Sequence, residues 1–270
     1  MNRITSQFDQ LKARGEKALV GFVTAGDPDM ETSLSLIEAM CRAGLDILEL
    51  GIPFSDPTAD GPVIQRSSQR ALAAGATGEK ILDMVEKIRA FTPIPIVLFS
   101  YTNPIFAMGY ETFAKKAARA EADALLMVDM PPEESSELDG HLDAQGLLPI
   151  RLMAPTTPDS RIETIAQGAK GFVYLISMTG VTGSGGLDPA LAARNIARVR
   201  AKTDLPICLG FGISTPGDVA AVAPHADGVV VGSAFEALVE TQIKKGRAGR
   251  QELPQRVEAF TRELKAATRG

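Results

Sequence analysis

Three acidic side chains near residue 50 are the best candidates for chemistry in this 270-residue sequence. Glu49 interrupts the apolar run 45–51, and Asp56 and Asp60 follow in a loop rich in proline and glycine. An unsatisfied polar group costs about 2–7 kcal/mol to bury, so an acid inside a buried strand needs a purpose. One buried and one loop carboxyl can divide acid–base catalysis and charge stabilisation between them. We therefore predict that Glu49 and Asp60 are catalytic, the alternative for Asp60 being an ordinary solvated loop acid, and we interpret Asp56 as a turn or partner-facing residue.

Glycines gather at three places later in the chain, and each group follows an apolar run. The groups lie in 179–186, 210–214 and 232–233. A single group of this kind usually makes only a tight turn. Three such groups after consecutive runs favour a phosphate site, because bare backbone amides at loops and helix N-termini bind anions. The segment 179–187 also has four glycines and no large side chain before Leu187, which is typical of a lid that closes over substrate.

Aromatic residues mark the ends of several apolar runs. Five of the 11 phenylalanines and 3 tyrosines fall there: Phe22, Phe99, Tyr101, Tyr174 and Phe211. Most buried phenylalanines are ordinary core residues. At strand ends, however, they would wall a pocket suited to a flat apolar group and leave a tyrosine hydroxyl for hydrogen bonding. We expect Tyr174 to reach towards Glu49.

Short apolar runs recur along the whole chain and predict eight strands. Between them, apolar residues are spaced three and four apart, as in 34–41, which is followed by Gly44 where a helix would stop. Near-continuous apolar strands with helical crossovers indicate a parallel sheet covered on both faces. Eight such units in about 250 residues predict the α/β class and a closed (β/α)₈ TIM barrel. The runs are 18–25, 45–51, 95–100, 124–128, 148–153, 171–177, 206–211 and 227–232.

An open doubly wound sheet is the alternative architecture. Against it, the first run leads into TAGDPD and not into a Gly-x-Gly-x-x-Gly turn. The pattern also predicts an extra N-terminal helix that plugs the bottom of the barrel. Residues 62–92 contain two helical patterns split by the breaker 75–78, so the second crossover should carry an extra helix. No linker divides residues 1–270, which we interpret as a single domain.

The barrel prediction gives Glu49 a definite place. Active-site side chains of TIM barrels lie at the carboxyl ends of the strands. Alternation along 45–51 puts Leu45, Ile47, Glu49 and Gly51 on one face, so we expect Glu49 to point into the barrel mouth. The alternative is a structural acid satisfied by a basic residue or by backbone amides.

Composition excludes several classes of function. The net charge of −5, without a basic stripe, gives no reason to expect nucleic acid or an anionic membrane as a partner. Cys41 and Cys208 lie far apart in apolar stretches, and His141 and His225 stand alone, so neither a disulfide nor a metal site is expected. No run is long enough to span a bilayer, so we expect a soluble, cytoplasmic protein.

The motifs together resemble the tryptophan synthase alpha family along almost the whole chain. The matching segments, in family order, are GFVTAGDPD, LELGIPFSDPTADGPVIQ, SYTNPI, GVTGSGG, GFGIS and VVVGSAF. The resemblance implies a lyase that splits indole-3-glycerol phosphate into indole and glyceraldehyde 3-phosphate without a cofactor. It also implies a beta subunit that holds pyridoxal phosphate, in an αββα assembly. The loops 53–60 and 179–187 would face that partner.

The resemblance further implies roles for individual residues. Glu49 would protonate the indole ring carbon and take the glyceryl hydroxyl proton. Asp60 would hydrogen-bond the indole N–H and stabilise the positive charge of the protonated ring. Tyr174 would help to position Glu49. The other implied substrate-binding residues are Phe22, Tyr101 and Phe211 at the indole, and Thr182, Gly183, Gly212, Gly232 and Ser233 towards the phosphate.

Two other functions stay open at this point. One is a different phosphate-binding TIM-barrel enzyme of amino-acid biosynthesis. Lys17 and Lys170 precede their strands and no other lysine lies in a strand, which disfavours a barrel that works through catalytic lysines. The other is a non-catalytic regulatory subunit that binds a phosphorylated ligand, for which two acids near an anion would serve no purpose.

Overall fold

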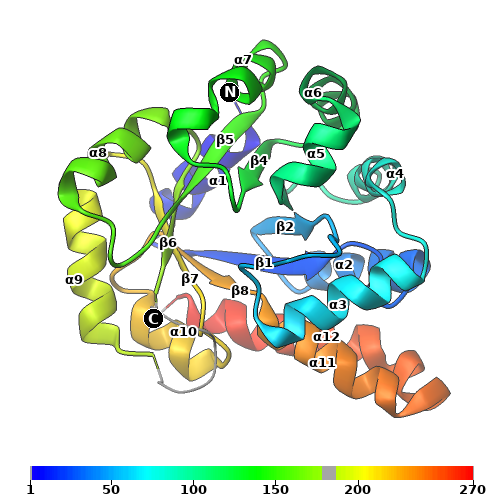
Figure 1. Ribbon diagram of the computed structural model, residues 1–270. Coiled ribbons are helices and arrows are strands. Elements are labelled where there is room, and N and C mark those ends of the chain that lie inside the picture. The colour runs from blue at the N-terminus through cyan, green and yellow to red at the C-terminus, as the bar shows by residue number, and fades with distance from the viewer. Residues whose placement is uncertain (1, 178–186, 270) are drawn as a thin grey trace.

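The computed structural model describes residues 2–177 and 187–269 (Figure 1). Eight parallel strands close into a barrel in the order β1 to β8, and helices surround it (Figure 1). The α/β class and the (β/α)₈ TIM barrel are therefore confirmed, and the open sheet is excluded. The strands are β1 Ala18–Thr24, β2 Ile47–Gly51, β3 Ile96–Ser100, β4 Ala124–Met127, β5 Leu148–Met153, β6 Val173–Ile176, β7 Ile207–Gly210 and β8 Gly228–Val231.

Helices fill the connections between the strands. Each of the eight predicted apolar runs contains one of the observed strands, so the predicted alternation is confirmed. The helices are α1 Arg3–Ala13, α2 Met30–Arg42, α3 Pro62–Ala73, α4 Gly78–Arg89, α5 Thr102–Met108, α6 Tyr110–Arg119, α7 Ser136–Ala144, α8 Asp159–Gly168, α9 Pro189–Arg200, α10 Pro216–Val222, α11 Ser233–Lys244 and α12 Gly246–Ala267, with a short 3₁₀ turn η1 at Pro132–Glu134.

The two expected extra helices are present. The apolar side chains of α1 belong to the same buried cluster as the residues inside the barrel, and Phe8 packs on Phe172 with ring centres 5.9 Å apart. The second crossover holds both α3 and α4. Between them Gly75 has φ +83°, which favours glycine, and the Thr77 side chain accepts a hydrogen bond from the Lys80 amide to start α4.

Two apolar clusters divide the interior. One lies inside the barrel and holds alternate residues of the strands, such as Val20, Ile47 and Val97. The other lies between the sheet and the helices and holds the intervening residues, such as Leu19 and Leu48. Leu45 belongs to this second cluster, so the expectation that it shares the face of Glu49 is wrong. The reason is local: β2 begins only at Ile47, and strand alternation does not extend back to Leu45.

Because all eight strands are parallel, their carboxyl ends meet at one end of the barrel and the loops there can form a common site. The strands extend from residue 18 to residue 231 and form one closed sheet, which is why we keep the interpretation of a single domain. Among the described helices, none is long and apolar enough to cross a membrane.

Candidate active site

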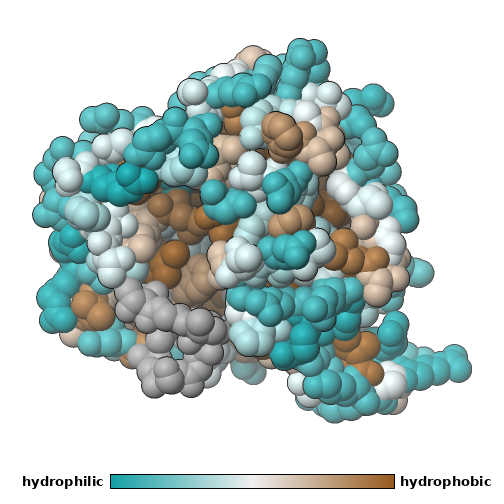
Figure 2. All heavy atoms as spheres, viewed as in Figure 1, coloured by the Kyte–Doolittle hydropathy of each residue, from teal (hydrophilic) through white to brown (hydrophobic). Residues whose placement is uncertain are grey.

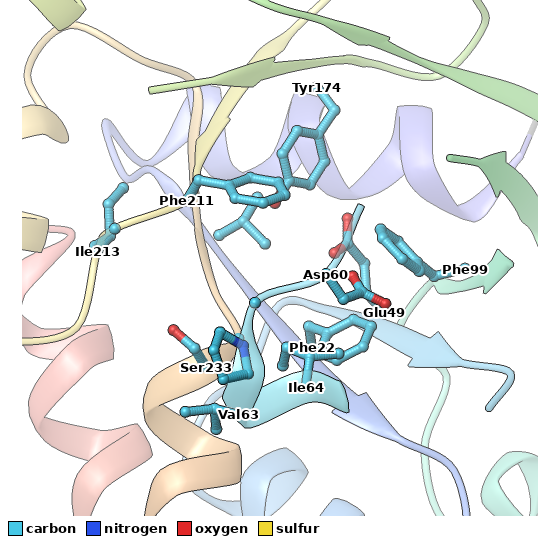
Figure 3. Close-up of a pocket in the computed structure, with 15 residues that line it drawn as sticks. Phe22, Glu49, Asp60, Val63, Ile64, Phe99, Tyr174, Phe211, Ile213 and Ser233 are labelled. Carbon is cyan, nitrogen blue, oxygen red and sulfur yellow. The ribbon is translucent and has the colours of Figure 1, made fainter. Parts of the chain in front are cut away.

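A cavity of about 300 Å³ opens at the carboxyl ends of the strands. Figure 2 shows apolar side chains gathered in a hollow on this face, with polar side chains around it. Figure 3 shows Glu49 and Asp60 among aromatic and aliphatic side chains of the wall. The lining residues are Phe22, Glu49, Asp60, Gly61, Pro62, Val63, Ile64, Phe99, Tyr174, Phe211, Gly212, Ile213, Val230, Gly232 and Ser233. The cavity thus brings together predicted site residues from five strands or their following loops.

Glu49 lies on β2 directly beside Phe22 of β1 in the strand register. The residue is 1% exposed, and neither carboxyl oxygen has a hydrogen-bond partner among the residues that the structure describes. Burial raises the pKa of Glu49 to about 8, because the charged form loses its hydration. Glu49 therefore carries a proton at neutral pH and can donate it. The alternative of a structural acid paired with a base has no support in the described part of the chain.

Asp60 lies in the loop after β2, half-buried at the cavity wall. Its carbonyl oxygen accepts a hydrogen bond of 2.9 Å from the Gln65 side chain, and its amide donates to the Pro57 carbonyl at 3.1 Å. Burial raises the pKa of Asp60 to about 6, and a hydrogen bond from Tyr101 works in the opposite direction. Asp60 is therefore mainly ionised at neutral pH, whereas Glu49 is mainly protonated. Two carboxyls in one cavity thus differ in charge.

Tyr101 occupies a different place from the one expected. It does not line the main cavity. It borders a much smaller space of about 10 Å³, which Asp60 and Phe54 also line. Its hydroxyl accepts a hydrogen bond of 3.0 Å from the Ala59 amide. In this structure Tyr101 therefore supports the loop that carries Asp60, and its direct contact with substrate stays a prediction.

The part of the cavity at the start of α11 has the features of an anion site. The 12-residue helix α11 begins at Ser233, directly after Gly232, and both residues line the cavity. The first amides of a helix have no partner within it, and the helix dipole favours a negative charge there. Phe211 and Gly212 have φ of +75° and +74°, which lets the chain turn sharply after β7. The predicted Thr182 and Gly183 and the lid 179–187, apart from Leu187, lie outside the described residues.

Tyr174 forms the wall on the β6 side of the cavity. The side chain is 4% exposed, and its ring meets that of Phe211 edge to face with centres 6.2 Å apart. Burial raises the pKa of Tyr174 well above its usual value, and the charge of nearby Glu49 adds to the effect. Tyr174 therefore stays neutral beside Glu49.

Four apolar lining residues had no predicted role in the site: Val63, Ile64, Ile213 and Val230. Alternation along β8 would have found Val230, since it lies two residues before Gly232. The other three follow loops whose path the sequence pattern does not show. Phe99, noted only as an aromatic at a strand end, also lines the cavity, where its ring meets Phe22 edge to face at 5.1 Å.

Known proteins resemble this chain over nearly its full length. Residues 8–269 match the family model described as tryptophan synthase alpha chain. The chain belongs to the tryptophan synthase alpha chain family. Relatives of that name from Desulfosudis oleivorans and Desulfatibacillum aliphaticivorans are 58% and 57% identical, each over 100% of both chains.

Solved structures agree with this membership in the family. The tryptophan synthase subunit alpha of Legionella pneumophila is 38% identical, with a TM-score of 0.90 over 99% of this chain and 98% of that one. A chain of tryptophan synthase from Mycobacterium tuberculosis in an aminoacrylate-bound form is 31% identical, with a TM-score of 0.87 over 100% of both chains. The resemblance inferred from the motifs is therefore confirmed.

Gly210 gives the first testable prediction, because it sets the position of Tyr174. A methyl group at Gly210 would lie 2.1 Å from the Tyr174 hydroxyl oxygen and 2.5 Å from Cζ. We expect Gly210→Ala to push the ring away from its place near Glu49 and to lower indole formation by about 10-fold, with about 1–3 kcal/mol of overpacking cost. Indole release and thermal unfolding measure the two effects.

The matched control is Gly140→Ala in α7. A methyl group there meets no atom within 4 Å. Replacing a helix glycine by alanine should raise the free energy of unfolding by up to about 1 kcal/mol and leave activity unchanged. Normal activity of Gly210→Ala would show that the position of Tyr174 does not matter.

Proposed function

We propose that this chain cleaves indole-3-glycerol phosphate into indole and glyceraldehyde 3-phosphate, the alpha reaction of tryptophan biosynthesis. The observation that carries the proposal is one cavity that holds a buried acid without a hydrogen-bond partner among the described residues, an ionised acid and a helix N-terminus suited to phosphate. Membership in the family supports it. Binding of an anion alone would not require a protonated acid without a partner, so the non-catalytic alternative explains less.

Glu49 moves the proton in this reaction. Its carboxyl donates a proton to the indole ring carbon that bears the glyceryl chain. The resulting carboxylate takes the proton of the neighbouring glyceryl hydroxyl, and the oxygen forms the aldehyde as the carbon–carbon bond breaks. The bonding electrons return to the ring, indole leaves, and Glu49 is protonated again. A pKa of about 8 suits both steps, because the acid and its conjugate base are both accessible near neutral pH.

Asp60 would stabilise the charge that forms on the ring. Protonation of the ring carbon leaves the indole positively charged, and its N–H becomes a stronger hydrogen-bond donor. An ionised carboxylate in a largely dry cavity stabilises that charge more than water would. Phe22, Phe99 and Phe211 would hold the flat ring between the two acids.

Ser233, Gly232 and Gly212 would bind the phosphate at the start of α11, and so hold the glyceryl chain in line with Glu49. We propose Thr182 and Gly183 as further contacts, and Tyr101 as a residue that supports Asp60. The chain needs no cofactor of its own for this chemistry. Pyridoxal phosphate would belong to a beta subunit that receives the indole, and the cytoplasm stays the expected location.

An indole-release assay tests the proposal directly. Purified chain is incubated with indole-3-glycerol phosphate, with and without a tryptophan synthase beta subunit, and indole is measured over time. We expect slow release by the chain alone and a clear rise with the beta subunit. No release under either condition would refute the proposed function, and release without a rise would refute the predicted coupling to the partner.

The two shifted carboxyls predict a bell-shaped pH dependence of kcat/KM. Activity should rise as Asp60 ionises near pH 6 and fall as Glu49 loses its proton near pH 8. A substrate phosphate also titrates near pH 6, at a pKa of about 6. Carbon-13 titration of the ligand-free protein therefore assigns the groups, with Glu49→Gln and Asp60→Asn as references. A Glu49 carboxyl that titrates near its ordinary value of 4.5 would contradict the prediction.

A further inference from the structure

Thr24 joins two helices that begin at different parts of the cavity. Its backbone amide donates a 2.6 Å hydrogen bond to Glu236 Oε1 on α11, and its hydroxyl lies 2.7 Å from the Ser67 hydroxyl on α3. Helix α3 begins two residues after Asp60, and α11 begins at Ser233. Thr24 itself is the last residue of β1, two positions after Phe22 of the cavity wall. Through these two buried contacts, Thr24 connects the helix that follows Asp60 with the helix that begins at Ser233.

Glu236 is an unexpected residue for this place. It lies one turn into α11 and is 1% exposed. Beside it Asp27, at the turn after β1, is held by Arg70 of α3 through two hydrogen bonds of 2.8 and 2.7 Å. Burial and the neighbouring Asp27 raise the pKa of Glu236 well above its usual value. The raised pKa favours the neutral form of Glu236, whose Oε1 accepts the hydrogen bond from the Thr24 amide and whose Oε2 has no hydrogen-bond partner among the described residues.

The raised pKa of Glu236 favours its neutral form, and this matters for the proposed phosphate site. A carboxylate one turn below Ser233 would repel an anion bound at the start of α11. A protonated carboxyl adds no such charge, and its Oε1 still accepts the hydrogen bond from the Thr24 amide. The N-terminal amides and the helix dipole can then act on the anion unopposed by this side chain.

We propose that Glu236 is a positioning residue that anchors the first turn of α11 to Thr24, and thereby sets the position of the phosphate relative to Glu49 and Asp60. This inference rests on the proposed function. Glu236 does not line the cavity, and it acts through the position of Ser233, which does.

A second contact between α3 and α11 provides the control. Glu240, one turn further along α11, accepts two hydrogen bonds of 3.0 and 2.8 Å from Arg66 of α3. This pair lies towards the surface, where the Arg66 side chain is 45% exposed. Glu240 also pairs with Lys244 of its own helix at 2.8 Å. It thus joins α11 to the same helix α3, but at the surface and further from Ser233.

The test compares binding of two fragments of the substrate to the full chain. Glycerol 3-phosphate probes the proposed anion site at the start of α11, and indole probes the proposed ring site beside Glu49 and Asp60. Calorimetry measures the binding of each. We expect Glu236→Leu to weaken glycerol 3-phosphate binding by about 10-fold and indole binding by less than about twofold. Glu236→Gln keeps an acceptor for the Thr24 amide and nearly the same side-chain volume, so it should bind both fragments like the parent chain. Glu240→Gln should also leave both affinities unchanged.

Turnover gives an independent measurement. For Glu236→Leu we expect KM for indole-3-glycerol phosphate to rise by more than kcat falls, and Glu236→Gln to restore the parent values. Circular dichroism checks the fold. If Glu236→Leu does not fold, Glu236→Asp, which withdraws the carboxyl by one methylene, replaces it in both measurements.

Three results would overturn the inference. The first is an equal loss of affinity for both fragments in Glu236→Leu. The second is a Glu236→Gln variant that binds glycerol 3-phosphate as weakly as Glu236→Leu. The third is a Glu240→Gln variant that binds it as weakly as either Glu236 variant. In each case a parent chain that still releases indole leaves the proposed function intact. A parent chain that binds no glycerol 3-phosphate and releases no indole would instead overturn both.

Discussion

Glu49→Gln should lower indole formation by about 10³-fold, equivalent to about 4 kcal/mol, while the protein stays folded. The amide fills nearly the same volume, but it can neither donate the proton to the ring carbon nor take the hydroxyl proton. Steady-state indole release measures the loss, and it should appear in kcat with KM little changed. Near-normal turnover by a variant with an unchanged circular dichroism spectrum would remove Glu49 from the mechanism.

Glu49→Gln should also change the free energy of unfolding. We expect an increase at alkaline pH, whereas most substitutions of buried residues lower this free energy. The pKa of Glu49 is about 8 in the folded chain against 4.5 for the free side chain, so the folded state binds more protons between these values. The stability of the parent chain therefore falls as pH rises from about 4.5 to about 8. Glu49→Gln lacks this loss and should gain a few kcal/mol over the parent at alkaline pH. Urea unfolding at acid and alkaline pH measures the difference.

Asp60→Asn should lower kcat by about 10²-fold, or about 3 kcal/mol. The amide oxygen still accepts a hydrogen bond from the indole N–H, but its charge is gone. The loss falls on the transition state, where the ring is positive, and substrate binding should change little. Indole release at saturating substrate is the measurement.

Asp56→Asn in the same loop is the matched control for Asp60. The Asp56 side chain is exposed, and its carboxylate accepts a hydrogen bond from its neighbour Ser55. Without a beta subunit this variant should turn over like the parent chain. Equal losses in Asp56→Asn and Asp60→Asn would show that the loop needs its overall negative charge, and not a carboxylate at residue 60.

A further comparison separates the roles of the two acids that we propose to be catalytic. In Asp60→Asn the acid limb of the pH profile should lose the part that Asp60 contributes and keep only that of the substrate phosphate, while the alkaline limb near pH 8 remains, because Glu49 still titrates. The double variant with Glu49→Gln should be little worse than Glu49→Gln alone, because charge on the ring arises only after protonation. Additive losses would mean that Asp60 acts at a step independent of Glu49.

The sequence alone predicted the barrel and the two catalytic candidates. Strand and helix periodicities are local properties, so eight apolar runs were enough to place all eight strands. Glu49 was visible for a related reason: an acid inside an apolar run is an anomaly that needs no tertiary information. Asp60 and the phosphate-type glycines gained their meaning from the motifs around them.

Only the tertiary structure decided which residues support those candidates. Tyr101 was expected in the cavity, and it lies against the loop of Asp60 because the path of that loop is not encoded in any periodic pattern. No sequence pattern marked Glu236 as a functional residue, since an acid in the first turn of a helix is common. Its burial against Asp27 and Thr24 depends on β1, α3 and α11 meeting in space. Chemistry at single residues could thus be predicted from sequence, whereas its positioning depends on contacts between residues far apart in the chain, 42 positions for Ala59 and Tyr101 and 212 for Thr24 and Glu236.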